Sequence, residues 1–431
     1  MQMKINKLEI FFFCCLVFYK LAIDIGFKII LTDLYPVYNL DFNVYKCLLG
    51  WFCCIIIFIL IEHKQKRVST FFIYLIYLFQ FIPITTIFGY KNESTIYYLF
   101  LFFGFVMCIF LVNHTHLPKR IKSSVNLSKI MIFAGALLTI FLMTIVFRKN
   151  GLPSLTALNL YDVYKLRRSN SFQLGHYTKA FILPFVINVY LPILIAKTIH
   201  DKRFWTTLFA CIIMFLIYLY TGHKTYIFSM ALVVLLSFWA KRPNVYMEFF
   251  SVFCIAFMAL TIGVIDSSNI CDSIYNFIGR RALIVPADLK YIHYDYFSNH
   301  LKLGLYGVLP LMLMFSIPKY YTRVLYPFEI GEIYFNSPLM SADTGALAEG
   351  YARFGYVGII IEFLLITLLL KLSDSFQERT DYSFAVGTLI FAFYSLSEGQ
   401  IIGTLFLGQW MFYIIFMLFY ISRDKSCLLG D

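Results

Sequence analysis

The chain has 431 residues, of which 60% are hydrophobic and only 14% are charged. Soluble domains typically hold roughly 45–50% apolar and about 25% charged residues, so this composition excludes a water-soluble globular protein. The formal net charge is +12, but no long basic tail or basic amphipathic stretch is present, which excludes nucleic acid as a partner. The sequence predicts an all-α polytopic membrane protein.

Apolar runs long enough to form membrane-spanning helices recur along the chain. A helix needs about 20 mostly apolar residues to cross a bilayer, and this length predicts about twelve spans within a single integral membrane domain, residues 1–431. The first run follows a lysine-bearing start without a small-residue cleavage site, which predicts a retained signal-anchor helix. The predicted spans are residues 8–30, 43–62, 69–88, 95–113, 129–147, 178–198, 204–221, 225–240, 246–265, 354–371, 382–396 and 403–421.

The charges in the connections between these spans predict their orientation. Short connections rich in lysine and arginine, such as residues 63–67 and 119–122, alternate with lysine-poor ones such as residues 31–42. The positive-inside rule places the basic connections and both chain ends in the cytoplasm. The two longest connections, residues 148–177 and 266–353, are then expected on the exported side.

The sequence offers no sign of a metal or cofactor. Its ten cysteines are scattered, and most fall inside apolar runs, where they behave as small hydrophobic residues. Because there is no CxxC pair and no HExxH helix, we predict neither a metal site nor a disulfide framework, and we predict no cofactor.

The first long connection, residues 148–177, carries more positive charge than the orientation rule favours on the exported side. Five cations are opposed there only by Asp162. Such an excess favours an anionic ligand; the alternative is that these cations bind lipid headgroups, as cations near a membrane often do. The five are Arg148, Lys149, Lys165, Arg167 and Arg168.

The second long connection, residues 266–353, contains a short apolar stretch at residues 303–318. Pro310 interrupts this stretch, and its length favours a re-entrant or interfacial segment over a full crossing. A full crossing would invert the last helices and place Lys371 outside, against the charge bias. A long exported connection rich in tyrosine, arginine and carboxylates predicts a binding or catalytic platform.

Two arginines near the start of the second connection are candidates for phosphate binding. Arg280 and Arg281 present planar guanidinium groups that match phosphate oxygens. His293 or Asp295 nearby is suited to take a proton from a hydroxyl group. The alternative is that one of the arginines pairs with Asp288 or Asp295 and braces the connection.

The end of the second connection predicts a helix that enters the membrane. Asp343 is a suitable N-cap, and small residues, among them Gly350 and Gly358, have spacings that permit close helix packing. Glu349 and Arg353 stand four residues apart on one face. This spacing is typical of a local salt bridge worth about 0.3–0.5 kcal/mol, while a place near an exported cavity favours a role in chemistry.

Other polar residues lie within or between the spans. His223 and Lys224 form an exported turn that can add a base or a cation to a site. Lys20 and Asp24, four residues apart in the first span, are expected to neutralise each other, because an unpaired charge at mid-bilayer costs about 2.5–3.5 kcal/mol. Glu362 is uncompensated in its local sequence and is expected to face the bundle interior or a polar partner.

Tyrosines are frequent in the long connections. A tyrosine ring combines an apolar face with a hydroxyl group, which suits carbohydrate binding and equally suits the membrane interface. These tyrosines include Tyr161, Tyr164, Tyr291, Tyr294, Tyr296, Tyr320, Tyr321, Tyr334 and Tyr351.

This layout resembles that of the Wzy-type polymerases of O-antigen and capsular repeat units. The likeness covers most of the chain as architecture, and its sequence-specific part lies at residues 280–296 and 336–358, the latter including GALAEGYARFGYVG. The resemblance implies a fold similar to the C superfamily of membrane glycosyltransferases, in the bacterial inner membrane, with the active site facing the periplasm. It also implies transfer of a glycan between undecaprenyl-diphosphate-linked donor and acceptor units, without a nucleotide sugar or an essential metal, and a chain-length regulator as a partner.

Within this resemblance we hypothesise that four arginines hold the diphosphate, namely Arg280, Arg281, Arg167 and Arg168. His293, Asp295 or Glu349 then takes the proton of the acceptor hydroxyl group. Where many relatives have an arginine after the short exported turn, this chain has His223 and Lys224. The predicted catalytic residues are Arg280, Arg281, His293, Asp295, Glu349 and Arg353, and the predicted substrate-binding residues are Arg148, Tyr164, Arg167, Arg168, His223, Lys224 and Tyr294.

Two other functions stay open on the sequence. A glycan ligase, which passes a finished polymer to a lipid core, uses similar donor chemistry. A lipid-linked oligosaccharide flippase, which is not an enzyme, fits the two long connections less well, because flippases keep outward connections short and distribute polar residues along their spans.

Overall fold

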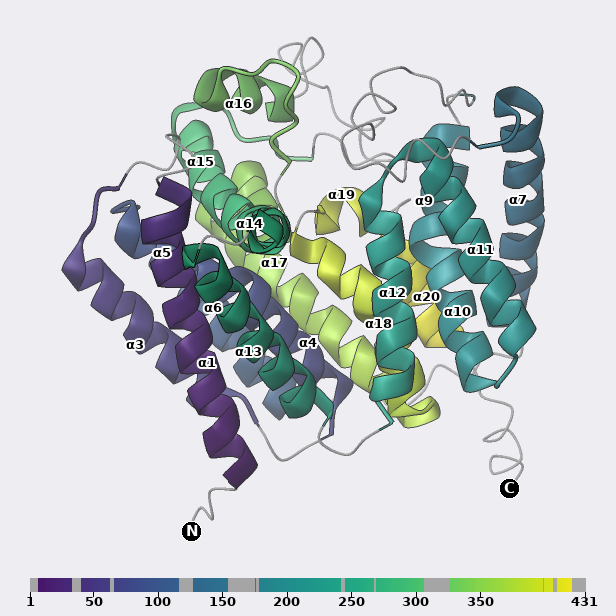
Figure 1. Cartoon of the computed structure of the whole chain (residues 1–431), viewed down its shortest axis with the longest axis horizontal. Helices are drawn as coiled ribbons and strands as arrows, with labels where there is room; N and C mark the ends of the chain where they lie inside the picture. Colours follow the sequence, from purple (N-terminus) through teal and green to yellow (C-terminus); the bar gives the residue numbers. More distant parts are fainter. Residues whose placement is uncertain are drawn as a thin grey trace. The chain divides into compact units, whose positions relative to one another are not determined.

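The computed structural model describes the chain as a set of helices (Figure 1). The described residues are 7–32, 40–62, 66–115, 127–153, 175, 178–241, 245–266, 269–305, 326–343, 345–397, 399–405 and 409–420. Within these ranges every regular element is a helix and none is a strand, which confirms the predicted all-α class. Tyr164, Arg167 and Arg168 lie outside the described residues, as does most of the predicted re-entrant segment 303–318.

Eight of the described helical runs are long and apolar enough to cross a membrane, as expected of a multi-pass membrane protein. Four shorter apolar helices of 10–17 residues accompany them, and each predicted span overlaps one of these twelve segments. These helices qualify by length and composition alone, so the number of crossings remains a prediction. The eight long runs are Lys7–Leu31, Val68–Tyr90, Thr95–His114, Lys129–Asn150, Leu183–His200, Phe204–Thr221, Tyr246–Ile265 and Ala346–Arg379, and the shorter helices are Val44–Leu60, Lys224–Trp239, Tyr382–Ser397 and Gln409–Phe419.

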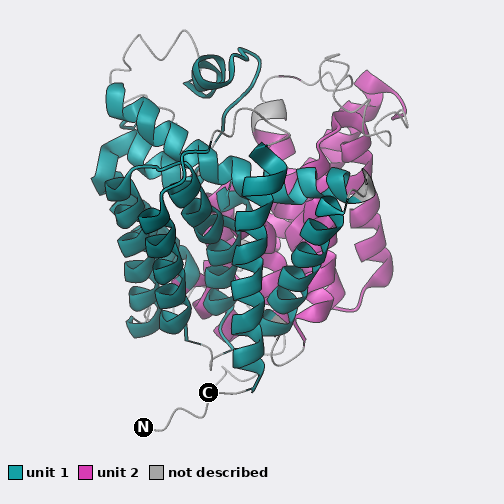
Figure 2. Ribbon diagram, turned by 60° about the vertical axis from the view of Figure 1, so that its left-hand side comes forward, with its two compact units in different colours: residues 1–116, 244–370, 394–403 teal, residues 117–243, 371–393, 404–431 magenta. Residues whose placement is uncertain are grey.

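The chain packs as two compact units, which Figure 2 shows in different colours. Unit 1 comprises residues 1–116, 244–370 and 394–403, and unit 2 comprises residues 117–243, 371–393 and 404–431. Each unit combines segments that are far apart in the sequence. The sequence predicts one continuous membrane domain and carries no signal for this division, because the chain passes from one unit to the other inside a helix, α17 (Ala346–Arg379).

Unit 1 contains a central rod made of α4 (Val68–Ile76), η2 (Tyr77–Phe81) and α5 (Ile82–Tyr90), which follow one another without a break. Every residue of α4 is buried, as in a helix that its neighbours enclose on all sides. The other elements that lie wholly in unit 1 are α1 (Lys7–Ile25), η1 (Gly26–Leu31), α3 (Val44–Leu60), α6 (Thr95–His114), α13 (Val245–Ile265), α14 (Asn269–Tyr275), η6 (Asn276–Ile284), α15 (Val285–Asn299), α16 (Tyr326–Phe335) and η9 (Ser395–Ser397), while α19 (Ile401–Leu405) begins in unit 1 and ends in unit 2. Within it, α3 and α15 pack against α5, and α1 packs along α13.

Wide π-helical turns lie directly before four prolines. Each of these turns ends two residues before its proline, so the helix continues through the proline instead of ending there. Proline has no N–H group and its ring clashes with the carbonyl group four residues earlier, and a wider turn accommodates both effects. The pairs are η2 with Pro83, η6 with Pro286, η4 (Thr178–Ile182) with Pro184 and η5 (Val186–Tyr190) with Pro192.

Helix α17 consists of two arms joined by a sharp turn. Phe354 (φ −135°, ψ 18°) and Gly355 (φ 65°, ψ −144°) leave helical geometry, and the positive φ of Gly355 favours glycine there. A Cβ atom on Gly350 would lie 2.5 Å from the carbonyl oxygen of Gly358, so the backbones of the two arms meet where only glycine fits. The close packing predicted for these glycines is confirmed, and the predicted span 354–371 corresponds to the second arm.

Unit 2 holds the remaining apolar helices. Its elements, besides η4 and η5, are α7 (Leu127–Asn150), α9 (Leu183–Phe185), α10 (Leu191–His200), α11 (Phe204–Thr221), α12 (Lys224–Trp239), most of α18 (Tyr382–Tyr394) and α20 (Gln409–Phe419). Helix α10 packs against α11 and α12. Arg379 donates to the carbonyl oxygens of Met417 and Leu418, at 2.5 and 2.7 Å, and so satisfies acceptors at the end of α20.

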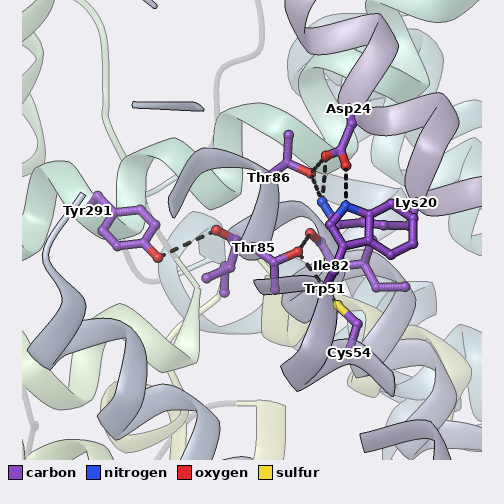
Figure 3. A network of polar contacts seen from close by, with 9 residues as sticks. Lys20, Asp24, Trp51, Cys54, Ile82, Thr85, Thr86 and Tyr291 are labelled. Carbon is purple, nitrogen blue, oxygen red and sulfur yellow. Dashed lines mark hydrogen bonds and ion pairs between the residues drawn. The ribbon is translucent and has the colours of Figure 1, made fainter. Parts of the chain in front are cut away.

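Lys20 and Asp24 form a buried pair inside unit 1, as predicted (Figure 3). Lys20 Nζ lies 2.5 Å from Asp24 Oδ1. The Thr86 hydroxyl group accepts from Lys20 at 2.8 Å and donates to Asp24 at 2.7 Å, and Trp51 donates to the other Asp24 oxygen at 3.1 Å. Groups from α1, α3 and α5 thus satisfy both charges, which lowers the cost of burying them.

Candidate functional site

The two predicted phosphate-binding arginines lie on η6. Arg280 is half-buried and donates through Nη1 to Asn276 Oδ1 at 3.2 Å, within the same element, while Arg281 is exposed. The described part of residues 266–353 is largely helical and contains α14, η6, α15 and α16. Its helices are short and polar, so no hydropathy criterion for spans detects them.

One face of α15 contacts the turn between α5 and α6. The sequence did not single out this turn. Lys91 Nζ, in that turn, lies 2.6 Å from Asp288 Oδ1, and the Asp288 side chain is only 2% exposed. Burial raises the pKa of Asp288, and the nearby Lys91 opposes this shift. Asp288 thus has a cationic partner 197 residues away in the sequence.

Asp295, two turns further along α15, is exposed. The hydroxyl group of Tyr334, on α16, donates to Asp295 Oδ2 at 2.6 Å. Burial, together with this hydrogen bond, raises the pKa of Tyr334. The contact holds α16 against α15 and leaves the other oxygen of Asp295 on the surface of unit 1.

His293 lies on a different face of α15 and is only 1% exposed. Its Nε2 atom lies 2.9 Å from the carbonyl oxygen of Ala342. Because a carbonyl group only accepts hydrogen bonds, Nε2 carries the proton and Nδ1 keeps a lone pair, for which the described residues supply no partner. Burial lowers the pKa of His293 to about 4, so the ring is neutral near pH 7.

Glu349 and Arg353 form a fully buried ion pair in the first arm of α17. Arg353 Nε lies 2.7 Å from Glu349 Oε1, and neither side chain is more than 2% exposed. The other nitrogens of Arg353 donate to Gly304 O at 3.1 Å and to Gln400 Oε1 at 3.4 Å. The predicted i to i+4 pair is confirmed, but it is the centre of a buried network and not an exposed local bridge.

This network reaches the surroundings of His293. Gln400 Nε2 donates to the hydroxyl group of Tyr326 at 2.6 Å, and the Tyr326 ring stands nearly perpendicular to the His293 ring, with centroids 5.9 Å apart. On the opposite side of the network, the backbone N–H group of Ile402 donates to Glu349 Oε2 at 3.2 Å. The structure therefore brings Glu349, Arg353 and His293 into one buried polar region.

Glu362, on the second arm of α17, is 0% exposed, which confirms that it faces the interior. Its electrostatic neighbours are the carboxyl group of Glu349 and the guanidinium group of Arg353. Neither carboxyl oxygen makes a hydrogen bond of standard length and angle with any described residue. Two carboxyl groups thus share the neighbourhood of one arginine.

Tyr294 belongs to a cluster of tyrosine rings from α6, α15 and α17. Its ring stacks on Tyr97, with centroids 4.5 Å apart, and lies 4.8 Å from Tyr351. Its hydroxyl group lies 3.1 Å from that of Tyr356 and accepts from Ser94 at 3.3 Å. Of these tyrosines, Tyr97 and Tyr351 are buried, while Tyr294 and Tyr356 are half-buried and keep part of their surface exposed.

Three other predicted residues lie in unit 2. Arg148 is exposed in the last turn of α7. His223 is the exposed N-cap residue of α12, its ring 5.5 Å from that of Tyr226, and the half-buried Lys224 begins the helix. The described residues hold no group of three or more His, Cys, Asp and Glu side chains placed to bind a metal ion.

Comparison with known proteins gives no relative. No family model matches the chain, and neither a curated protein nor a solved structure matches it. The candidate site therefore rests on the geometry of unit 1, where α15 packs against α5 and Asp288 pairs with Lys91 in the α5–α6 turn.

Proposed function

We propose that the protein joins undecaprenyl-diphosphate-linked oligosaccharide units into a polysaccharide of the O-antigen or capsular kind, at the periplasmic face of the bacterial inner membrane. The observation that carries this proposal is the helical platform of α15, α16 and the first arm of α17. It gathers carboxylates, a histidine and partly open tyrosine rings next to helices long enough to cross a bilayer. This arrangement suits a lipid-linked sugar, because its lipid stays in the membrane while its sugar reacts outside.

The proposed reaction needs two kinds of group. The acceptor hydroxyl group loses its proton as it attacks the anomeric carbon, and the departing diphosphate gains negative charge. Exposed Arg281 and half-buried Arg280 are suited to stabilise that charge through paired N–H donors. Tyr294 and Tyr356 offer ring surface and hydroxyl groups to a sugar.

The geometry favours a positioning role for Arg353. Its guanidinium group is engaged by Glu349, Gly304 and Gln400 and is buried, so it holds the first arm of α17 in place. In the proposed mechanism the diphosphate is therefore bound by the arginines of η6.

A deletion strain tests the class of reaction. We expect gel profiles of its surface polysaccharide to collapse from a ladder to a single repeat unit. Lipid core without any attached glycan would instead indicate a ligase, and lipid-linked units confined to the cytoplasmic leaflet would indicate a flippase. An unchanged ladder would remove all three readings.

Replacement of Arg281 tests the proposed diphosphate site in the same strain. Arg281→Ala is expected to abolish long chains at an unchanged protein level, because the leaving group loses its charge partner. Arg203→Ala removes another exposed arginine, in a turn that the charge pattern places in the cytoplasm, and should leave the ladder intact. Normal chain lengths in Arg281→Ala would take this residue out of the mechanism.

A further inference from the structure

The turn between α5 and α6 presents a carboxylate that is held in place but not engaged. Glu93 is half-buried, and its side chain makes no hydrogen bond or ion pair with the described residues. Its backbone, in contrast, is fixed. Lys46 donates to the carbonyl oxygens of Asn92 and Glu93 at 2.8 and 2.6 Å, and the Glu93 N–H group donates to Phe88 O at 3.2 Å.

Charged groups of both signs surround this carboxylate. Lys91 stands in the same turn and Lys46 on α3, while Asp288 and Asp295 face it from α15. Tyr291, also on α15, is its remaining titratable neighbour. Burial raises the pKa of Glu93 to about 7; Asp288 and Asp295 add to this shift, and Lys91 and Lys46 oppose it.

Glu93 is also next to the tyrosine cluster. The following residue, Ser94, donates to the hydroxyl group of Tyr294 at 3.3 Å and caps α6 by accepting from the N–H group of Tyr97. A sugar that contacts the exposed parts of Tyr294 and Tyr356 therefore lies beside the turn that carries Glu93.

We propose that Glu93 is the general base of the glycan transfer, an inference that rests on the function proposed above. The acceptor O–H bond breaks and its proton passes to the Glu93 carboxylate. The freed oxygen forms the new bond to the anomeric carbon of the donor, and the bond from that carbon to the diphosphate breaks, its electron pair leaving with the diphosphate. Every proton and electron pair is thus accounted for without a further reactant.

The bases considered from the sequence are less well placed. Glu349 is buried in an ion pair with Arg353 and also accepts from Ile402. His293 is 1% exposed and binds protons too weakly, with a pKa of about 4. Asp295 is accessible, but one of its oxygens already accepts from Tyr334. A base works best when its pKa lies near the operating pH, and Glu93 meets this condition.

Chain extension by the full-length protein in lipid nanodiscs tests the proposal. The probe is the single-repeat lipid-linked glycan that the deletion strain is expected to accumulate. Glu93 can accept a proton only as the carboxylate, so protonation of Glu93 stops the reaction. We expect the initial rate to fall about tenfold per pH unit below the pKa of about 7. Glu93→Gln should lose about 10²–10⁴-fold in rate. Glu62→Gln, which neutralises an exposed carboxylate at a span end that the charge pattern places in the cytoplasm, should match the wild type.

Two further variants separate proton transfer from structure. Glu93→Asp keeps a carboxylate and should recover part of the rate. Asp295→Asn removes a like charge, so it should lower the pKa of Glu93 and move the acid limb of the profile to lower pH. A normal rate and pH profile in Glu93→Gln would overturn the proposal. Loss of activity in Asp295→Asn together with activity in Glu93→Gln would also overturn it and assign the base to Asp295.

A spectroscopic titration needs no substrate. Infrared difference spectra of the wild type should show a carboxyl group that titrates near pH 7, and Glu93→Gln should lack that band. Absence of such a band in the wild type would overturn the proposal. The outcome is distinct from failure of the proposed function, which would appear as an unchanged polysaccharide ladder in the deletion strain and would remove the basis for any base assignment.

Discussion

At the scale of single residues, the site depends on buried charges whose partners are remote in sequence. Glu349 and Arg353 are neighbours on one helix, so their pairing was predictable from spacing. The groups that complete the network were not, because Gly304 and Gln400 lie 49 and 47 residues from Arg353. Nor did the sequence point to Glu93, because a single carboxylate in a short turn forms no motif that predicts function. Its neighbours Asp288 and Asp295 meet it only through the packing of α15 on α5.

Breaking the Glu349–Arg353 pair should destabilise the protein more than removing both charges. Arg353→Met leaves a buried carboxylate without its cation, and such losses cost about 3–5 kcal/mol. The double variant Glu349→Gln/Arg353→Met keeps an acceptor for the Ile402 N–H group and removes the charge of Glu349 together with that of its partner, so it should be more stable than Arg353→Met alone. Thermal unfolding of the purified proteins measures both effects. Equal losses in the two variants would contradict the buried-pair interpretation.

At the scale of elements, hydropathy located the long apolar helices. The π-helical turns and the short helices depend on other interactions. The runs at 69–88 and 95–113 were found from the sequence because a membrane-spanning helix needs about 20 consecutive, mostly apolar residues. The π-helical turns before Pro83 and Pro286 were not, because they depend on how a helix relaxes around a missing N–H group. The short helices α14, α15 and α16 are stabilised by contacts with other segments, as between Tyr334 and Asp295, and such contacts leave no periodic apolar signal.

We expect alanine at Gly350 and alanine at Gly355, both in α17, to have different effects. Gly350→Ala places a Cβ atom 2.5 Å from the Gly358 carbonyl oxygen, so the arms must separate and the Glu349–Arg353 pair must shift. Gly355→Ala meets no atom closer than 3.8 Å, so its cost is the backbone strain alone, about 1–3 kcal/mol.

Thermal unfolding and polysaccharide profiles of the two variants separate these effects. We expect Gly350→Ala to lose polymer length as well as stability, whereas Gly355→Ala should mainly lose stability. If Gly350→Ala behaved as the wild type in both measurements, the close crossing of the two arms would be wrong.

At the scale of the whole molecule, composition alone established a membrane protein, and the long apolar helices agree with that class. Composition carried no information on the division into two units, since each is assembled from three separate stretches of chain. Orientation across the bilayer follows from the charge pattern and stays a prediction.

Labelling of introduced cysteines tests that orientation. Cys47 and Cys271 are partly exposed and lie at or near connections assigned to the exported side, so both are first replaced by Ser. In this background a membrane-impermeant maleimide added to intact cells should label Glu332→Cys on α16, because α16 belongs to the connection assigned to the exported side. Arg203→Cys, in a basic turn, should react only after the cells are opened. Both residues are exposed in the structure, so access through the protein does not limit the reaction. The reverse pattern would place the proposed site in the cytoplasm and remove the proposed function.

The crossing of Gly350 and Gly358 has a consequence for how this chain tolerates changes of length. An α-helix turns by about 100° for each residue, so inserting or deleting one residue between the two glycines would rotate one of them away from the other. A bulkier neighbour would then enter the contact, and the arms would no longer close. The eight-residue separation of the glycines in the sequence is therefore expected to be as strictly required as their identity.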